Sequence, residues 1–124
     1  MPKIGLSKEE CINQLQSYSN KIDEICGLFD DRGFILKGQK EKAQMLLTKL
    51  KEEFKDDYKL RHTERGKEQM TEVEQACFLP AIDEAHTRIY VKTNSIPSSK
   101  WLDDLYDVQG SSIKYYLDQL SEWK

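Results

Sequence analysis

The stretch 7-SKEECINQLQSYSNKIDEICGLF-29 indicates the fold class more clearly than any other part of the chain. Ser7 and Glu10 have the spacing of a capping box, in which the serine accepts a hydrogen bond from a helix amide and the glutamate bonds back to the cap. Apolar residues then recur at spacings of 4, 3, 4, 3 and 4, which is typical of one buried helical face. These residues are Cys11, Leu15, Tyr18, Ile22, Ile25 and Phe29. The pattern predicts a helix over residues 7–30 that ends before Gly33.

Three more helices are predicted from the same kind of periodicity. Apolar residues on one face indicate helices over residues 36–62, 67–92 and 99–123, joined by short connections. Four amphipathic helices in succession are typical of an all-α antiparallel bundle. The 124 residues are enough for one domain with its own core. We therefore expect a single helical-bundle domain over residues 1–124.

Two residues interrupt the predicted helices. Pro80 lies inside the third helix, where proline removes a backbone hydrogen bond and pushes the turn apart, so we expect a kink that bends this helix around the core. Gly110 lies inside the fourth helix, but the apolar residues keep the same phase on both sides of it. We expect one helix, kinked at Gly110, and two short helices are the alternative.

Composition and charge disfavour several classes of protein. The net charge is −3, and acidic and basic residues are interleaved, which argues against a nucleic-acid partner. The three cysteines are odd in number and lack the spacing of a disulfide framework or a zinc site. No apolar run is long enough to span a membrane, and no signal peptide is recognisable. These features predict a cytoplasmic protein without a membrane association or a cofactor.

Polar residues of the third helix are the first candidates for a functional site. Asp83 and His86 lie one helical turn apart, as an acid that orients a histidine would. A di-iron bundle needs a second pair of this kind, which the chain lacks, so we interpret the pair as structural or surface. Glu74 projects toward the apolar face, where an unpaired carboxylate would be unfavourable. We expect Glu74 to pair with a tyrosine or an arginine of another helix.

A magnesium site is the alternative interpretation of these acids. Glu53 and Asp56 on the second helix, with Glu74, Asp83 and His86 on the third, supply oxygen ligands that suit Mg²⁺ and a histidine near the substrate. The arrangement is similar to that of all-helical nucleotide pyrophosphohydrolases, which carry Glu-x-x-Glu followed downstream by Glu-x-x-Asp. This chain departs from that pattern in both spacing and repetition. The resemblance implies a Mg-dependent nucleotide or phosphate-ester hydrolase as the alternative function.

The last helix provides the observation on which the preferred function depends. Trp101, Val108 and Tyr115 recur at intervals of seven outside its main apolar face. Such a wide apolar arc is covered either by a central position in a monomer or by a second molecule, and aromatic residues are enriched in interfaces. No nucleophile elbow, P-loop or cysteine–histidine motif is present. We expect a non-catalytic adaptor, regulator or inhibitor that binds a protein partner, or itself, through this aromatic seam.

Overall fold

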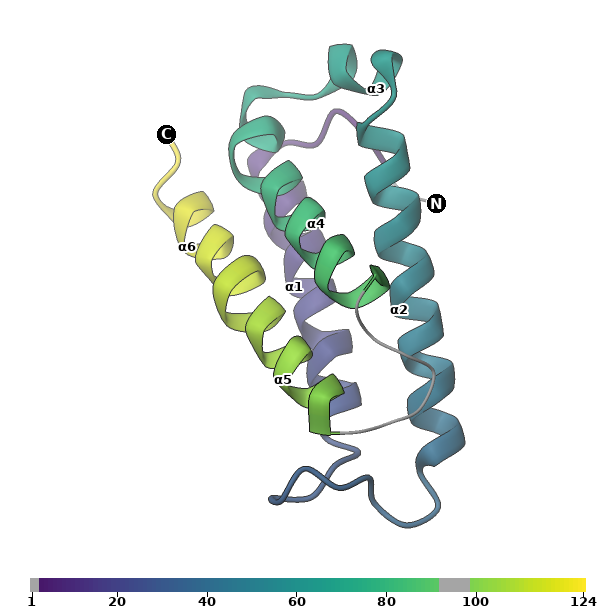
Figure 1. The fold of residues 1–124 in the computed structure, drawn as a ribbon. Coiled ribbons are helices and arrows are strands. Elements are labelled where there is room, and N and C mark those ends of the chain that lie inside the picture. The colour runs from purple at the N-terminus through teal and green to yellow at the C-terminus, as the bar shows by residue number, and fades with distance from the viewer. Residues whose placement is uncertain (1–2, 92–98) are drawn as a thin grey trace.

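The structure, a computed structural model, describes residues 3–91 and 99–124. Four long helical segments lie side by side and run in alternating directions (Figure 1). The first and third segments each pack against the second and the fourth. The only β-structure within the described ranges is one isolated bridge. The all-α antiparallel bundle that the sequence predicts is confirmed.

The first helix, α1 (Lys8–Cys26), begins at the predicted capping box. The Ser7 hydroxyl accepts a hydrogen bond from the Glu10 amide at 3.2 Å, and the Glu10 carboxylate accepts one from the Ser7 amide at 3.2 Å. The helix ends at Cys26, with Gly27 as its C-cap, four residues earlier than the predicted end at residue 30. It is shorter because the chain turns back on itself directly after Gly27.

The connection between α1 and α2 (Lys40–Arg61) is an ordered turn, although the apolar pattern predicts that residues 36–39 belong to a helix. Phe29 and Ile35 form an antiparallel β-bridge across this turn. Gly38 then adopts a positive φ of 78°, a conformation that L-residues with a side chain rarely adopt. Helix α2 therefore begins at Lys40 and not at residue 36.

A short helix, α3 (Glu64–Gln69), follows α2 where the sequence predicts a turn and the start of the third helix. The third helical segment begins instead at residue 72. Thr71 caps it, because its hydroxyl accepts a hydrogen bond from the Glu74 amide at 3.2 Å and its amide donates to the Glu74 carboxylate at 3.0 Å. Thr-x-x-Glu is thus a capping box in the sequence that marks the true start of this segment.

The third helical segment alternates between two helical forms. After its first two residues, 72 and 73, it consists of the π-helical turn η1 (Glu74–Phe78), helix α4 (Leu79–Ala85) and the π-helical turn η2 (His86–Val91). Pro80 lies in the first turn of α4, and the Leu79 amide before it bonds to the Glu74 carbonyl five residues back. The distortion expected at Pro80 takes the form of this π-helical turn. The predicted end at residue 92 lies outside the described residues.

The last helical segment is continuous across Gly110. It consists of α5 (Ser99–Asp107), the π-helical turn η3 (Val108–Lys114) and α6 (Tyr115–Ser121). Gly110 lies within η3, so the glycine coincides with a change in helical winding and not with a break between two helices. The prediction of one helix is confirmed, and the alternative of two short helices is wrong.

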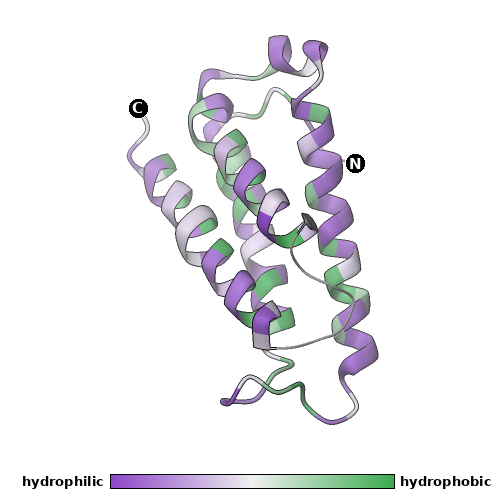
Figure 2. Ribbon diagram, viewed as in Figure 1, coloured by the Kyte–Doolittle hydropathy of each residue, from purple (hydrophilic) through white to green (hydrophobic). Residues whose placement is uncertain are grey.

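The core lies along the axis of the bundle. Apolar residues line the inner faces of the helices and polar residues the outer faces (Figure 2). The largest fully buried apolar or aromatic side chains include Tyr18, Phe54, Phe78 and Trp101, one or more from each of the four segments. Within the described ranges, no helix combines the length and the apolar character that crossing a membrane requires.

Candidate functional site

Glu74 lies in a buried polar network that joins three parts of the chain. Its side chain has no exposed surface, and its carboxylate accepts hydrogen bonds from the Leu6 amide at 2.5 Å and from Arg61 Nη2 at 3.1 Å. Arg61 is equally buried, and its Nη2 also donates to the Lys3 carbonyl at 2.6 Å. The prediction that Glu74 pairs with an arginine of another helix is confirmed, since Arg61 is the last residue of α2.

Asp57 extends this network to α1. Its Oδ1 accepts a hydrogen bond from Arg61 Nη1, and its Oδ2 accepts one from the Tyr18 hydroxyl at 2.5 Å. Burial raises the pKa of Asp57, while the contacts with Arg61 and Tyr18 oppose that rise. Burial and the nearby Asp57 charge raise the pKa of the Tyr18 phenol, which therefore stays a hydrogen-bond donor. One guanidinium thus balances two buried carboxylates and holds α2 to the N-terminal and third segments.

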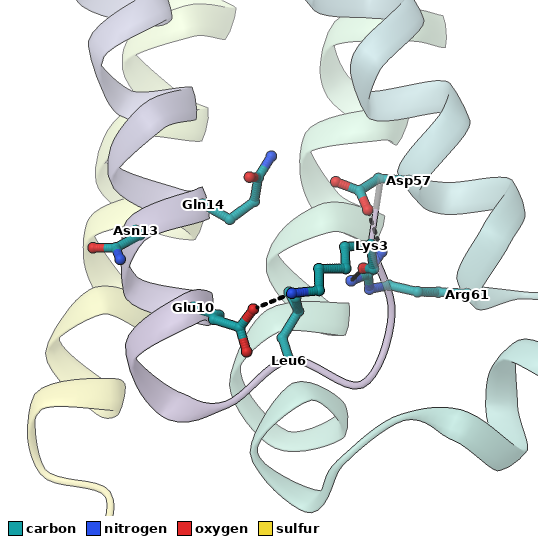
Figure 3. A pocket seen from close by; sticks show the side chains of 7 residues that line it. All are labelled: Lys3, Leu6, Glu10, Asn13, Gln14, Asp57 and Arg61. Carbon is teal, nitrogen blue, oxygen red and sulfur yellow. Dashed lines mark hydrogen bonds and ion pairs between the residues drawn. The ribbon is translucent and has the colours of Figure 1, made fainter. Parts of the chain in front are cut away.

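A hollow of about 240 Å³ lies beside the network, between the N-terminal residues, α1 and α2 (Figure 3). Lys3 extends across it and pairs with Glu10 at 2.8 Å, while Gln14 reaches toward it from α1. Arg61, which lines the hollow, has one buried nitrogen, Nε, without a hydrogen-bond partner. The buried charges of Asp57 and Arg61 already bind one another, so we interpret this hollow as structural.

The Asp83–His86 pair suggested by the spacing does not form. Asp83 contacts His62 instead, with 2.7 Å between its Oδ1 and the imidazole Nε2. His86 turns toward α2 and stacks between Tyr58 and Tyr90, at ring-centroid distances of 4.2 and 5.0 Å. Partial burial lowers the pKa of His86 against the opposing effect of Asp83. The sequence could not reveal the His62–Asp83 contact because it joins two different helices.

The five residues of the magnesium alternative do not converge. Glu53 pairs with Lys21 at 2.6 Å, and Asp56 is exposed on the outer side of α2. Glu74 pairs with Arg61. Asp83 contacts the imidazole of His62, and His86 stacks on the ring of Tyr58. In the part of the chain that the structure describes, no three His, Cys, Asp or Glu side chains are placed to hold a metal ion together.

Two of the three residues of the predicted aromatic seam belong to the chain's own core. Trp101 is 1 % exposed and Val108 is 0 % exposed, whereas Tyr115 is 51 % exposed. The last helical segment contacts α1 and the third segment, and these neighbours cover its wide apolar arc. The seam is therefore not one continuous surface, and the expectation that Trp101 and Val108 bind a partner is corrected. Partner binding stays a prediction for Tyr115 alone.

A different apolar feature is exposed at the turn between α1 and α2. Phe34 is 62 % exposed, the highest value among the large apolar side chains of the described residues, and Leu36 is 41 % exposed. Between them, Ile35 packs against the core. This alternation is that of an extended strand, where neighbouring side chains point to opposite faces. We call Phe34 and Leu36 together the apolar edge.

Hydrogen bonds within the turn hold the apolar edge in place. Asp30 Oδ1 accepts hydrogen bonds from the Arg32 amide at 2.8 Å and the Phe34 amide at 3.0 Å, and these bonds lower the pKa of Asp30. The Asp30 amide donates to the Phe34 carbonyl at 2.8 Å, and the Leu36 amide donates to the Leu28 carbonyl at 2.8 Å. Phe34 is therefore presented on a fixed backbone.

No protein-family model matches this chain, and neither a curated protein nor a solved structure is significantly similar to it. Its function is therefore inferred below from its own residues and their geometry.

Proposed function

We propose that this chain is a non-catalytic protein-interaction module that binds a protein partner through the apolar edge. The observation that carries the proposal is the 62 % exposure of Phe34 on a hydrogen-bonded turn. Aromatic residues are enriched in the buried centres of protein interfaces. Full burial of a side chain of this size contributes about 1.5–3 kcal/mol, so covering the exposed part of Phe34 contributes roughly 1–2 kcal/mol.

The fixed backbone of the turn supports this proposal. Binding is weakened by the entropy lost when flexible residues become ordered, and a preorganised segment avoids much of that loss. Asp30 already holds the Arg32 and Phe34 amides, and the Phe29–Ile35 bridge fixes the base of the turn. The partner therefore meets Phe34 in a single orientation.

The state of the polar side chains supports a non-catalytic function. The groups that an acid–base or metal-dependent mechanism would use are Asp57, Glu74, Asp83 and His86. The first two are enclosed around Arg61, Asp83 contacts His62, and His86 is stacked between two tyrosines. Glu53 is likewise paired, with Lys21. We therefore favour binding over catalysis.

Affinity capture with matched variants tests the proposal. Phe34→Asp and Tyr115→Asp make the same kind of change at two aromatic residues of similar exposure, 62 % and 51 %. Each tagged protein is incubated with an extract of the source cells, and bound proteins are quantified by mass spectrometry. We expect a protein that the wild type and Tyr115→Asp retain and that Phe34→Asp loses.

Leu36→Asp is a second variant at the same edge and should also lose this protein. Thermal unfolding of each variant checks the fold, because exposed substitutions of this kind change stability by only about 0.5 kcal/mol. Equal capture by the wild type and both edge variants would refute the proposal. Loss with Tyr115→Asp alone would return the binding site to the C-terminal helix.

A further inference from the structure

We infer that the partner presents an acidic segment with an apolar anchor to the apolar edge; this inference rests on the proposed function. Basic residues lie before and after the edge. Between Arg32 and Lys42 the chain has four basic residues and one acidic residue, Glu41, a net charge of +3. Asp30 and Asp31 directly precede this stretch and reduce the net charge of residues 30–42 to +1, in a chain whose overall charge is −3. The overall charge of −3 conceals this local excess of positive charge.

The basic side chains are available to a partner. Lys37, Lys40 and Lys42 are exposed, and none of them forms an ion pair with a carboxylate of the described residues. Arg32 is also exposed and lies 3.7 Å from Asp30. Asp30 Oδ1 is bound to the backbone amides of the turn, and its Oδ2 is the atom nearest to Arg32, so the three lysines carry most of the unpaired positive charge. The excess of positive charge is therefore presented to solvent.

The charges surround the apolar edge on both sides. The Arg32 guanidinium carbon lies 5.3 Å from the centroid of the Phe34 ring, and Lys37 directly follows Leu36. When an apolar side chain of the partner covers Phe34, a carboxylate next to it in the partner's sequence would lie close to Arg32 or Lys37. Opposite charges at the rim of an interface raise the association rate and help select the partner.

A peptide segment is favoured over an anionic membrane surface, which also attracts lysines and apolar side chains. The edge has two apolar side chains on a rigid turn, with a spacing fixed by the Phe29–Ile35 bridge. A fixed spacing of side chains allows a peptide of defined sequence to be recognised. Binding to a fluid lipid surface does not require a fixed spacing. Stable attachment to membranes also usually needs a second anchor in addition to one weak apolar contact.

Selection from a library of random 16-residue displayed peptides tests the inference. The full chain is immobilised, and peptides that also bind Phe34→Asp are removed. We expect the enriched peptides to carry a net negative charge and at least one large apolar residue. The best peptide should bind the Lys37→Glu, Lys40→Glu, Lys42→Glu variant about tenfold more weakly than the wild type, and its affinity should fall as salt rises.

The outcomes separate this inference from the proposed function. Phe34-dependent peptides without an acidic bias, or with unchanged affinity for the triple Glu variant, would overturn the inference and leave the proposed function standing. No Phe34-dependent peptide at all would count against both. Phe34-dependent binding to vesicles of phosphatidylserine, tighter than to any selected peptide, would replace the peptide partner with a membrane surface.

Discussion

Replacing Arg61 by methionine tests the role of the buried network. Methionine replaces the arginine stem with an apolar chain, and it removes the guanidinium, whose carbon lies 4.4 Å from the centroid of the Phe78 ring. The substitution removes the cation shared by Asp57 and Glu74 and leaves two buried carboxylates without a positive partner. Removing one partner of a buried ion pair destabilises a protein by about 3–5 kcal/mol. Whole domains have about 5–15 kcal/mol of stability, so the effect should be severe.

Urea unfolding followed by circular dichroism measures the loss in free energy of unfolding, and thermal unfolding measures the change in melting temperature. For a chain of this size about 3 °C of melting temperature corresponds to 1 kcal/mol, so we expect Arg61→Met to melt about 10–15 °C lower than the wild type. Arg65→Met is the matched control, because Arg65 is an exposed arginine four residues later, in α3. This control should change stability by no more than about 0.5 kcal/mol.

The pH dependence of the Arg61→Met variant gives a second test of the same reasoning. Burial raises the pKa of Asp57, and without the opposing effect of Arg61 this pKa should rise further above its unfolded-state value. The destabilising effect of the Asp57 charge is then absent below the unfolded-state pKa and increases as the pH rises through the folded-state pKa. The deficit of the variant should be smaller at pH 5 than at pH 7. A loss below about 1 kcal/mol, or the same deficit at both pH values, would refute a structural role for Arg61.

Further predictions concern other parts of the bundle. Because burial raises the pKa of Asp57, the stability that its proton contributes is complete below the unfolded-state pKa and is lost as the pH rises through the folded-state pKa. Between pH 4 and pH 7, the free energy of unfolding measured in urea should therefore fall less for the Asp57→Asn variant than for the wild type. Gly110→Ala should raise stability by about 0.5–1 kcal/mol, since a Cβ there meets no atom within 4 Å. Gly66→Ala should lower the melting temperature, since its Cβ would lie 2.1 Å from a backbone carbonyl oxygen. Burial raises the pKa of Cys11 to about 12 and of Cys26 to about 11, so both thiols should react with Ellman's reagent at pH 8 much more slowly in the native protein than in urea.

Local signals in the sequence were sufficient to predict most of the helices. The Ser7–Glu10 capping box forms as expected, because both of its hydrogen bonds are made within one turn. The phase of the apolar residues correctly predicted a continuous helix across Gly110. The Thr71–Glu74 capping box was equally present in the sequence and would have corrected the start of the third segment.

The predicted seam failed because a seven-residue repeat does not follow a straight helical face. Each step of seven residues drifts by about 20°, so Tyr115 lies about 40° away from Trp101. The π-helical turn η3 lies between Val108 and Tyr115 and adds to this drift, because it winds fewer degrees per residue. Trp101 and Val108 therefore face the core, while Tyr115 faces solvent.

The sequence does not reveal the apolar edge, because Leu36 continues the apolar periodicity of α2 and is therefore predicted to lie on the buried face of that helix. The true conformation depends on the Phe29–Ile35 bridge and on Asp30, whose contacts form only when the chain has turned back. The His62–Asp83 contact has the same origin, since it joins residues of different helices. Contacts of this kind are set by packing, and helical periodicity carries no information about them.

Photo-crosslinking from position 34 tests the central claim, that binding takes place at the apolar edge, most directly. Benzoylphenylalanine replaces Phe34 in one protein and Tyr115 in a control, two positions with 62 % and 51 % exposure. Both proteins are expressed in the source cells and irradiated, and the adducts are identified by mass spectrometry. We expect one protein to be crosslinked at position 34 and not at position 115, and Leu36→Asp to remove this adduct. No adduct at position 34, or the same adducts from both positions, would contradict the account.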